Sequence, residues 1–466
     1  MAKTKIVCTI GPSSESPEVL KALILNGMNV ARLNFSHGSH KEHLKKINTI
    51  RSVSEKLGAH VAILQDLCGP KIRIGKVKEP GVRLNPGQTY VLTSRHVEGD
   101  QERVSVSYEN LPSDVKPGER ILLADGMMEL VVKKTSRTDI SCEVVTGGWL
   151  TSNKGINLPT GTIKADAITA KDRKDLLFGL KNNVDYIALS FVRSAKDIIG
   201  LKKIIKREKK NTPVIAKIEK HEALKDIEGI IEVSDGIMVA RGDLGVEIPL
   251  ENVPNIQKML VKKANDIGKP VIIATQMLRS MVSAPRPSRA EANDVANAVL
   301  DGADAVMLSE ETASGEYPVQ AVQFMRRIAE KAEEIFPHEK YLSLMPEKDV
   351  SDSVAYASCV LADHLDVKAI VATTRSGSTA AHISRFRPKP VIIALSPERS
   401  AVRRLALYWG CLPILVAGTK GKEEKTDTAL PVIASGYVKK GDLVVITSGY
   451  PEYVEGTTNM MRVVKL

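Results

Sequence analysis

Two short runs place charged residues at the end of strand-like apolar stretches. They are residues 215–219 (IAKIE) and 238–243 (MVARGD), which together supply two carboxylates, a lysine and an arginine, with no histidine or cysteine. Carboxylate oxygens are ligands for a hard cation such as Mg²⁺, and lysine and arginine bind phosphorylated anions. The two runs therefore predict phosphoryl transfer, in which catalysis is mostly positioning and charge neutralisation. Either run alone is equally typical of a buried strand with a solvated end.

The two runs belong to a strand-and-helix pattern that repeats along the chain. Eight apolar runs are each followed by a polar turn and a helical pattern; they span residues 6–10, 28–35, 61–64, 186–191, 214–219, 237–241, 271–274 and 305–308. Strands that alternate with helices imply a parallel sheet covered on both faces. Eight such repeats favour a closed (β/α)₈ barrel of the TIM type over an open sheet.

Residues able to do chemistry lie at or just after the predicted strands. They are Arg32, Asn34, Ser36, Asp66, Ser190, Lys217, Glu219, Asp243, Thr275 and Ser309. Active sites of such barrels lie at the carboxyl ends of the strands. One polar residue in this position would be a helix cap, but the whole set predicts a single active site at that face.

The regular spacing fails between the third and fourth runs. Residues 71–166 contain short alternating segments separated by Pro-Gly pairs, which is typical of a small all-β domain. We expect a β-barrel lid inserted into a catalytic barrel formed by residues 1–70 and 167–337. Such a lid would exclude water from a transferable phosphoryl group. The alternative is a passive insertion.

Residues 338–466 are predicted to form a third domain, of the α/β class. A strand at 369–374 leads into a hydroxyl-rich loop at 373–379 and a helical run at 380–386. Backbone N–H groups and the helix dipole at such a turn favour anions, so the loop is a candidate phosphate cradle. Its glycine spacing is not that of a P-loop, and a plain turn with a Ser/Thr cap is the alternative.

Composition fits a globular protein of several domains. The 466 residues are 43% hydrophobic and 26% charged, and the chain is too long for one ordinary core. No apolar run reaches the ~20 residues of a membrane span, and the amino terminus enters a strand without a signal-peptide pattern. The five cysteines are odd in number and lack a ligand pattern, which favours reduced thiols and a cytoplasmic location.

Two other classes of protein compete with a phosphotransferase. The formal net charge of +11 raises a nucleic-acid-binding protein. However, lysines and arginines are spread through the chain and only 4% of residues are aromatic, which leaves little for stacking on bases. The second alternative is a metal-dependent carbon–carbon lyase. It would share Glu219 and Asp243 but would need neither a nucleotide lid nor a third domain.

Six motifs in this order resemble those of the pyruvate kinase family. They are residues 5–12 (KIVCTIGP), 29–38 (NVARLNFSHG), 217–219 (KIE), 240–247 (ARGDLGVE), 274–278 (ATQML) and 307–313 (MLSEETA). The resemblance covers essentially the whole chain, including the inserted and C-terminal domains. It implies transfer of the phosphoryl group of phosphoenolpyruvate to ADP, giving ATP and pyruvate in the final step of glycolysis. The reaction passes through a metal-bound enolate that is then protonated.

Carried over residue by residue, the resemblance implies how the barrel residues act. Glu219 and Asp243 would hold a divalent ion, Mg²⁺ or Mn²⁺, that bridges the substrate's carboxylate and phosphoryl oxygens. Arg32 would neutralise the phosphoryl group in flight. Lys217 would stabilise negative charge on that group and on the enolate oxygen.

The remaining matches concern the substrate and the nucleotide. Backbone N–H groups around Gly242 and Asp243 would receive the substrate carboxylate. Thr275 would order the substrate and, with Ser309, a water chain that delivers the proton. Substrate binding would also include Ser190. The nucleotide-contacting positions are Asn34, Arg73 and, from the lid, Lys154.

One stretch departs from the commonest pattern of the family. Many members have DTKGPEIR after the third strand and require K⁺, whereas residues 66–73 here are DLCGPKIR. Lys71 replaces the glutamate and Leu67 the threonine, as in the potassium-independent branch. A fixed ammonium beside the phosphoryl site can do a monovalent cation's electrostatic work, which adds Lys71 to the catalytic residues. K⁺ is therefore not expected to be required at the positions of the family's K⁺ site, which are Asn34, Ser36 and Asp66.

The resemblance also reaches the C-terminal domain. It implies that the loop is an anion site for a sugar-phosphate or nucleotide effector, formed by Thr373, Thr374, Arg375, Ser376, Gly377, Ser378 and Thr379. Two acidic residues further on, Glu452 and Glu455, disfavour a bisphosphate there. A homotetramer is implied by the family alone.

Overall fold

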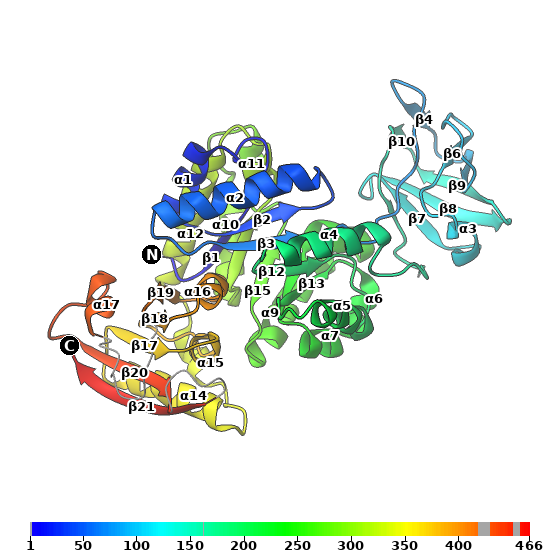
Figure 1. Ribbon diagram of the computed structural model, residues 1–466. Helices are drawn as coiled ribbons and strands as arrows, with labels where there is room; N and C mark the ends of the chain where they lie inside the picture. The colour runs from blue at the N-terminus through cyan, green and yellow to red at the C-terminus, as the bar shows by residue number, and fades with distance from the viewer. Residues whose placement is uncertain (1, 162, 418–428, 451–456) are drawn as a thin grey trace.

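Eight parallel strands close into a barrel at the centre of the molecule (Figure 1). The computed structural model describes residues 2–161, 163–417, 429–450 and 457–466. The barrel strands are β1 (Lys5–Thr9), β2 (Met28–Asn34), β3 (Ala62–Asp66), β12 (Tyr186–Leu189), β13 (Val214–Ile218), β14 (Gly236–Ala240), β15 (Val271–Ala274) and β16 (Ala305–Leu308). Their order around the barrel is β1-β16-β15-β14-β13-β12-β3-β2. The predicted (β/α)₈ fold is confirmed.

Helices cover the outside of the barrel. The longer ones are α1 (Pro17–Leu25), α2 (His40–Lys56), α4 (Ala170–Lys181), α5 (Ala195–Arg207), α7 (Ile227–Val233), α9 (Val253–Asp266), α10 (Arg289–Asp301) and α12 (Pro318–Glu333). Capping boxes begin several of them, among them those of Ser39 before α2, Thr169 before α4 and Ser288 before α10. Such caps satisfy backbone N–H groups that the first helical turn leaves free.

Shorter helical segments follow several strands at the carboxyl face. They are α6 (His221–Lys225), α8 (Arg241–Glu247), η1 (Leu250–Asn252), η2 (Arg279–Val282) and α11 (Glu310–Ala313). The strands themselves are almost completely buried, with every residue of β1, β3, β13 and β14 inside. Burial on both faces explains why they are continuous apolar runs in the sequence.

The inserted domain has a hydrophobic core of its own. Its elements are β4 (Val82–Leu84), β5 (Thr89–Thr93), β6 (Arg103–Ser105), α3 (Leu111–Asp114), β7 (Arg120–Leu123), β8 (Met128–Thr135), β9 (Asp139–Thr146), β10 (Gly148–Leu150) and β11 (Ile156–Asn157). They form a six-stranded sheet, β11-β7-β8-β9-β5-β6, and a two-stranded ribbon of β10 and β4. The sheet is not closed into a barrel among the described residues, and α3 adds one short helix. We call this domain the lid.

The C-terminal domain contains a five-stranded sheet, β19-β18-β17-β20-β21. Its elements are α13 (His338–Leu342), α14 (Val350–His364), β17 (Ala369–Thr373), α15 (Ser378–Arg385), β18 (Val391–Ser396), α16 (Arg399–Leu405), β19 (Cys411–Leu415), α17 (Ala429–Ala434), β20 (Leu443–Gly449) and β21 (Thr458–Lys465). Strand β21 is antiparallel to β20. The edge strand β19 was not expected from the sequence, because Pro413 interrupts its pattern; an edge position tolerates a proline.

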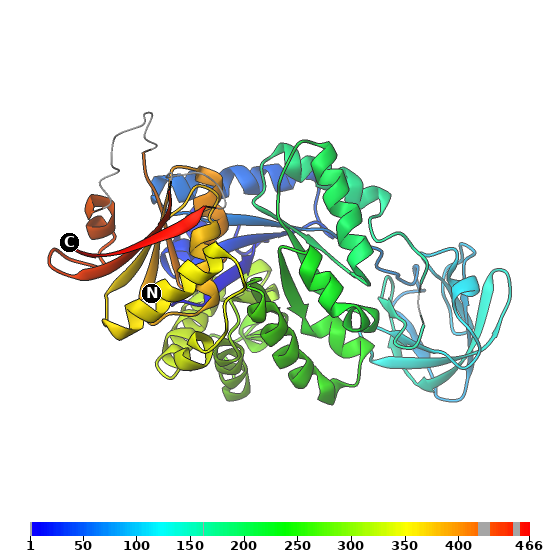
Figure 2. The ribbon, with the colours of Figure 1, turned by 90° about the horizontal axis from the view of Figure 1, so that it is seen from below.

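Lid and C-terminal domain lie at opposite ends of the barrel, as the turned view shows (Figure 2). Arginines of the C-terminal domain reach into the barrel. The guanidinium of Arg387, 2% exposed, donates to both carboxylate oxygens of Asp304 at 2.8 Å. Arg403 and the barrel's Arg51 both donate to Asp185 at 2.7 Å. Buried, paired charges of this kind hold the two domains in one orientation.

A membrane-crossing helix is not found among the residues that the structure describes, because none of their helices is both long and apolar enough.

Candidate active site

The carboxyl ends of strands β2, β3 and β13 bring four charged side chains into one buried cluster, with β12 lying between β3 and β13. At its centre is Lys217, the fourth residue of β13. Its Nζ lies 3.2 Å from Oδ1 of Asp66 and 2.9 Å from Oε1 of Glu219, and donates to Oγ of Ser190 at 2.7 Å. Arg32 at the end of β2 donates from Nε to Oδ2 of Asp66 at 2.7 Å. These residues were predicted from the sequence to share one face, and the structure brings them together.

Opposite charges keep this cluster ionised. Burial alone would raise the pKa of the Asp66 carboxyl, but Lys217 and Arg32 hold that pKa below its usual value. Burial would likewise lower the pKa of Lys217, yet the carboxylates of Asp66 and Glu219 raise it well above its usual value. Lys217 is therefore an ammonium at any physiological pH, fixed in a site with little water.

Glu219 has a different electrostatic environment. Burial raises the pKa of its carboxyl, and the negative charges of Asp243 and Asp66 add to this against the opposing effect of Lys217. Its Oε2 accepts the backbone N–H of Phe191 at 2.8 Å. Burial and the like charges around Glu219 therefore disfavour its ionised form, and a further cation beside the carboxylate would stabilise that form.

Phe191 presents that N–H from a left-handed backbone conformation with φ of +56°. Such a conformation is unusual for a bulky residue and is typical of functional sites. Gly69 makes it sterically possible, since a Cβ there would lie 3.0 Å from the Phe191 ring and from the Ser190 carbonyl oxygen. Sequence reasoning missed this contact, because nothing in the motif around Phe191 signals its conformation.

Thr275 follows β15 with φ of +72°, a rare conformation for a β-branched residue. Its Oγ1 accepts the N–H of Gly242 at 2.7 Å and donates to the Ala274 carbonyl at 2.6 Å. The first turn of α8, which carries Asp243, is thereby tied to the end of β15. The Gly242 N–H, which we expected to receive the substrate carboxylate, is bonded to Thr275 in this structure.

Arg241 does not have the anion-binding role that its sequence motif suggested. Its guanidinium donates to both carboxylate oxygens of Asp294, at 2.6 and 2.7 Å, and to the Thr275 carbonyl at 3.0 Å. An arginine held this way braces the start of α8 and is not free to bind a phosphorylated anion. Asp294 lies in α10, far away in sequence, so the pairing could not be anticipated.

Ser309 lies just beyond the end of β16, beside the end of β1. Its N–H donates to Oε2 of Glu311 at 2.7 Å, while Oε1 of the same carboxylate accepts the N–H of Leu278 at 3.0 Å. Glu311 is 1% exposed. It therefore links the loops after β15 and β16, on which Thr275 and Ser309 lie.

Comparison with known proteins agrees with this geometry. Residues 1–322 match the family model of the pyruvate kinase barrel domain, and residues 352–464 match that of the pyruvate kinase alpha/beta domain. A pyruvate kinase of Staphylococcus haemolyticus is 49% identical over 469 residues, and one of Staphylococcus aureus is 48% identical. Each alignment covers 99% of this chain and 80% of the relative.

The chain belongs to the pyruvate kinase family. It is accordingly an enzyme, a phosphotransferase, and the family carries a requirement for a divalent metal ion.

Lys71, one of the two residues in which the chain departs from the commonest family pattern, faces the site. Its Nζ donates to Oδ1 of Asp243 at 3.2 Å and lies 5.9 Å from the centre of the Phe191 ring. About a quarter of each partner's side chain is exposed. The Lys71 side chain is therefore directed at Asp243 and not only into water.

The residues expected to bind K⁺ and the nucleotide are less closely grouped than those in the cluster around Lys217. Oδ1 of Asn34 accepts the N–H of Ser36 at 3.1 Å, while Asp66 is engaged by the buried cations. On the lid side, Arg73 donates to the Asn153 carbonyl at 3.0 Å, and the side chain of Lys154 is exposed. These two residues lie on facing segments of the lid, which are joined by a bridge between Arg73 and Gly155.

The predicted effector loop connects β17 to α15. Gly377 has φ of +100°, and its N–H donates to Oγ1 of Thr374 at 3.0 Å. Oγ of Ser376 donates to Oγ of Ser378 at 3.3 Å, and Arg375 lies 3.5 Å from Glu398. Buried in the same loop, Thr373 ends β17 and Thr379 bonds to Thr458 at 2.7 Å. Glu452 and Glu455 lie outside the described residues.

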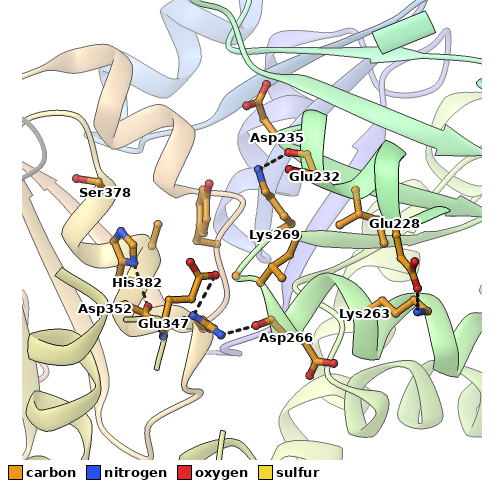
Figure 3. Close-up of a pocket in the computed structure, with 16 residues that line it drawn as sticks. Glu228, Glu232, Asp235, Lys263, Asp266, Lys269, Glu347, Asp352, Ser378 and His382 are labelled. Atoms are coloured by element: carbon orange, nitrogen blue, oxygen red, sulfur yellow. Dashed lines mark hydrogen bonds and ion pairs between the residues drawn. The ribbon is translucent and has the colours of Figure 1, made fainter. Parts of the chain in front are cut away.

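A large cavity lies near this loop and not at the barrel's carboxyl face. Its volume is about 890 Å³, and its walls come from the barrel and from the C-terminal domain (Figure 3). Figure 3 shows Ser378 and His382 on one side and Lys269 on the other. Oδ1 of Asp352 lies 3.1 Å from Nδ1 of His382. The effector loop therefore ends at an open space between two domains.

Proposed function

We propose that this chain transfers the phosphoryl group of phosphoenolpyruvate to ADP, giving ATP and pyruvate through an enolate. The observation that carries the proposal is the buried cluster at the strand ends. There Lys217, permanently charged, lies between Asp66 and Glu219, with Arg32 beside it. A fixed array of this kind stabilises charge that moves between phosphoryl and enolate oxygens without reorganisation.

Glu219 and Asp243 are the residues that would hold a divalent ion. Both are oxygen donors, as Mg²⁺ and Mn²⁺ require. Burial and neighbouring carboxylates raise the pKa of the Glu219 carboxyl, so a cation beside it would stabilise the charged form, which supports this assignment. When bound, the ion supplies Lewis-acid polarisation of the substrate's carboxylate and phosphoryl oxygens.

The chain's own residues then have separate roles. Arg32 neutralises the phosphoryl group during transfer, and Lys217 stabilises the enolate oxygen. Ser190, which accepts from Lys217, orients that ammonium. Thr275 and Ser309, held by adjacent loops, order the water that delivers a proton to the enolate's methylene carbon. Asn34, Arg73 and Lys154 contact the nucleotide.

We also assign the enzyme to the potassium-independent type. The Lys71 ammonium, 3.2 Å from Asp243, supplies the charge that K⁺ supplies in other members. Asp66, which would be a ligand of K⁺ together with Asn34 and Ser36, already has two cationic partners. A further cation at that carboxylate would meet repulsion from both.

Family membership supports a further proposal on assembly, location and regulation. We propose a homotetramer in the cytoplasm, with domains at residues 1–70 and 167–337, 71–166 and 338–466. The loop from Thr373 to Thr379 is proposed to bind a sugar-phosphate or nucleotide effector.

A coupled assay with phosphoenolpyruvate and ADP tests the proposed function. We expect pyruvate and ATP in equal amounts, only when Mg²⁺ or Mn²⁺ is present, and without added K⁺. Cleavage of a carbon–carbon bond in place of phosphoryl transfer would favour the lyase. Salt-resistant nucleic-acid binding with no phosphoryl transfer would favour the nucleic-acid-binding class.

A further inference from the structure

Glu247, the last residue of α8, has a completely buried carboxylate with three partners. Its Oε1 accepts from Nζ of Lys220 at 2.7 Å and from Nδ2 of Asn157 at 3.1 Å. Its Oε2 lies 3.2 Å from Nδ1 of His221. Burial would raise the pKa of this carboxyl, but the bonds from His221 and Lys220 hold it below its usual value. Glu247 is therefore a charged acceptor, fixed at the centre of a small network.

The partners of Glu247 come from two separate parts of the chain, the lid and the segment that follows β13. Asn157 belongs to β11 of the lid, and its side chain is buried although the lid is a separate domain. Lys220 is the residue after Glu219. Asp243 precedes Glu247 by four residues in α8, so the two lie on one face of that helix.

A second contact holds the segment that leads from the lid back into the barrel. Arg193 donates to the carbonyls of Ile163 and Ala165, at 2.6 and 2.8 Å. That contact holds the connecting segment, whereas the bond between Asn157 and Glu247 runs from a strand of the lid sheet itself. Displacing the lid would remove one hydrogen-bond donor from the Glu247 carboxylate and so change how that carboxylate holds α8 and Lys220.

We propose that Glu247 is a positioning residue that couples the placement of the lid to the geometry of Glu219 and Asp243. It touches no substrate and acts through Asn157 on one side and through α8 and Lys220 on the other. The effect of this coupling on catalysis rests on the proposed function, whereas the coupling between the lid and α8 can be measured without any reaction.

Asn157→Asp tests the lid side of the coupling, because it places a carboxylate against that of Glu247 at nearly constant shape. Glu247→Gln tests the barrel side, and it leaves Lys220 without its counter-charge. The matched controls are Asn85→Asp, on an exposed turn of the lid, and Glu251→Gln, exposed in η1. Thermal unfolding of all four variants establishes that they are folded.

Two activities distinguish a defect in the lid from a defect in the barrel. Phosphoryl transfer needs both domains. Exchange of pyruvate methyl protons with D₂O needs only the barrel: a methyl C–H bond breaks, its proton passes to water, and the enolate takes back a deuteron. We expect Asn157→Asp to lower kcat for transfer about 10-fold or more and to raise the KM for ADP. Its pyruvate exchange should also fall, but less than transfer, because exchange needs Glu219 and Asp243 but not the placement of the nucleotide by the lid. Glu247→Gln should lose both activities, and the controls neither.

Amide hydrogen exchange of residues 241–247 supplies the second measurement. Asn157→Asp should accelerate exchange in α8, although the substitution lies in the lid; Asn85→Asp should not. Unchanged exchange in α8, or wild-type transfer kinetics for Asn157→Asp, would overturn the coupling. Equal loss of transfer and pyruvate exchange in Asn157→Asp would also overturn it, because that pattern is a general structural defect. A wild-type enzyme without transfer activity would instead reject the proposed function and the catalytic part of this inference, while α8 exchange still decides the coupling.

Discussion

Lys71 and Asp243 join the start of the lid to the helix that offers a metal ligand, with Nζ and Oδ1 3.2 Å apart. Lys71 is the first residue that we assign to the lid, and Asp243 lies in the first turn of α8. An ammonium in this place lowers the negative charge that Asp243 and Glu219 share. The contact therefore connects lid position, metal affinity and the need for a monovalent cation.

Lys71→Glu should make turnover depend on K⁺. Without K⁺, the new carboxylate repels Asp243 and activity should fall about 10²-fold; added K⁺ should restore part of it, because the cation replaces the lost charge. The measurement is kcat in tetramethylammonium buffer with and without KCl. Lys76→Glu, exposed on the lid, is the control and should behave like wild type. Strong K⁺ activation of the unmodified enzyme would contradict the assignment.

Glu219→Gln should abolish metal-dependent turnover while leaving the fold intact. The amide offers one weak oxygen donor and no charge, so kcat should fall about 10²-fold or more, and Mn²⁺ should bind more weakly in calorimetry. Glu228→Gln, at an exposed position, should change neither quantity. Normal activity with normal Mn²⁺ affinity would place the metal site elsewhere.

Ser376→Asp tests the effector loop. A carboxylate in the loop would repel a bound phosphate, so activation by a monophosphorylated sugar or nucleotide should be lost while basal kcat is kept. The readout is the KM for phosphoenolpyruvate with increasing effector. Ser400→Asp, exposed on α16, should keep the activation. If an activator works equally well on Ser376→Asp, its site is not this loop.

Asp304→Asn should destabilise the enzyme without touching the active site. Arg387 would keep a buried positive charge without its counter-charge, which costs about 3–5 kcal/mol. We expect a lower urea midpoint and a lower Tm, with little change in the KM of the remaining folded enzyme. Asp363→Asn removes an ion pair to the exposed Lys389 and should change the midpoint little. Equal midpoints for Asp304→Asn and wild type would show that the arginine pair contributes nothing to stability.

The barrel could be predicted because its strands are buried on both faces and are therefore continuous apolar runs. Residues at the ends of those strands, such as Lys217 and Asp66, could also be placed, since parallel strands end at one face. What could not be predicted are contacts between residues far apart in sequence. Asp294 bracing Arg241 and Glu311 linking two loops depend on how helices outside the barrel pack.

Backbone conformation was a second limit. The left-handed conformations of Phe191 and Thr275 follow from the surrounding contacts, and neither residue type favours them. The edge strand β19 was missed for a related reason, because Pro413 is unfavourable in an interior strand and acceptable only where a partner strand is absent. In each case tertiary structure overrides the local preference.

The separate hydrophobic core of the lid bears on the order in which the chain can fold during synthesis. Strand β3 pairs with β12, with Leu64 opposite Tyr186, so the barrel sheet can be continued only after the ribosome has delivered the whole intervening segment. Closing a disordered loop of that length would cost chain entropy. A lid that has already folded on its own core brings the two connecting segments together and shortens the loop that remains to be closed. Early folding of the inserted domain would thereby help the barrel to close, independently of what the lid does to a substrate.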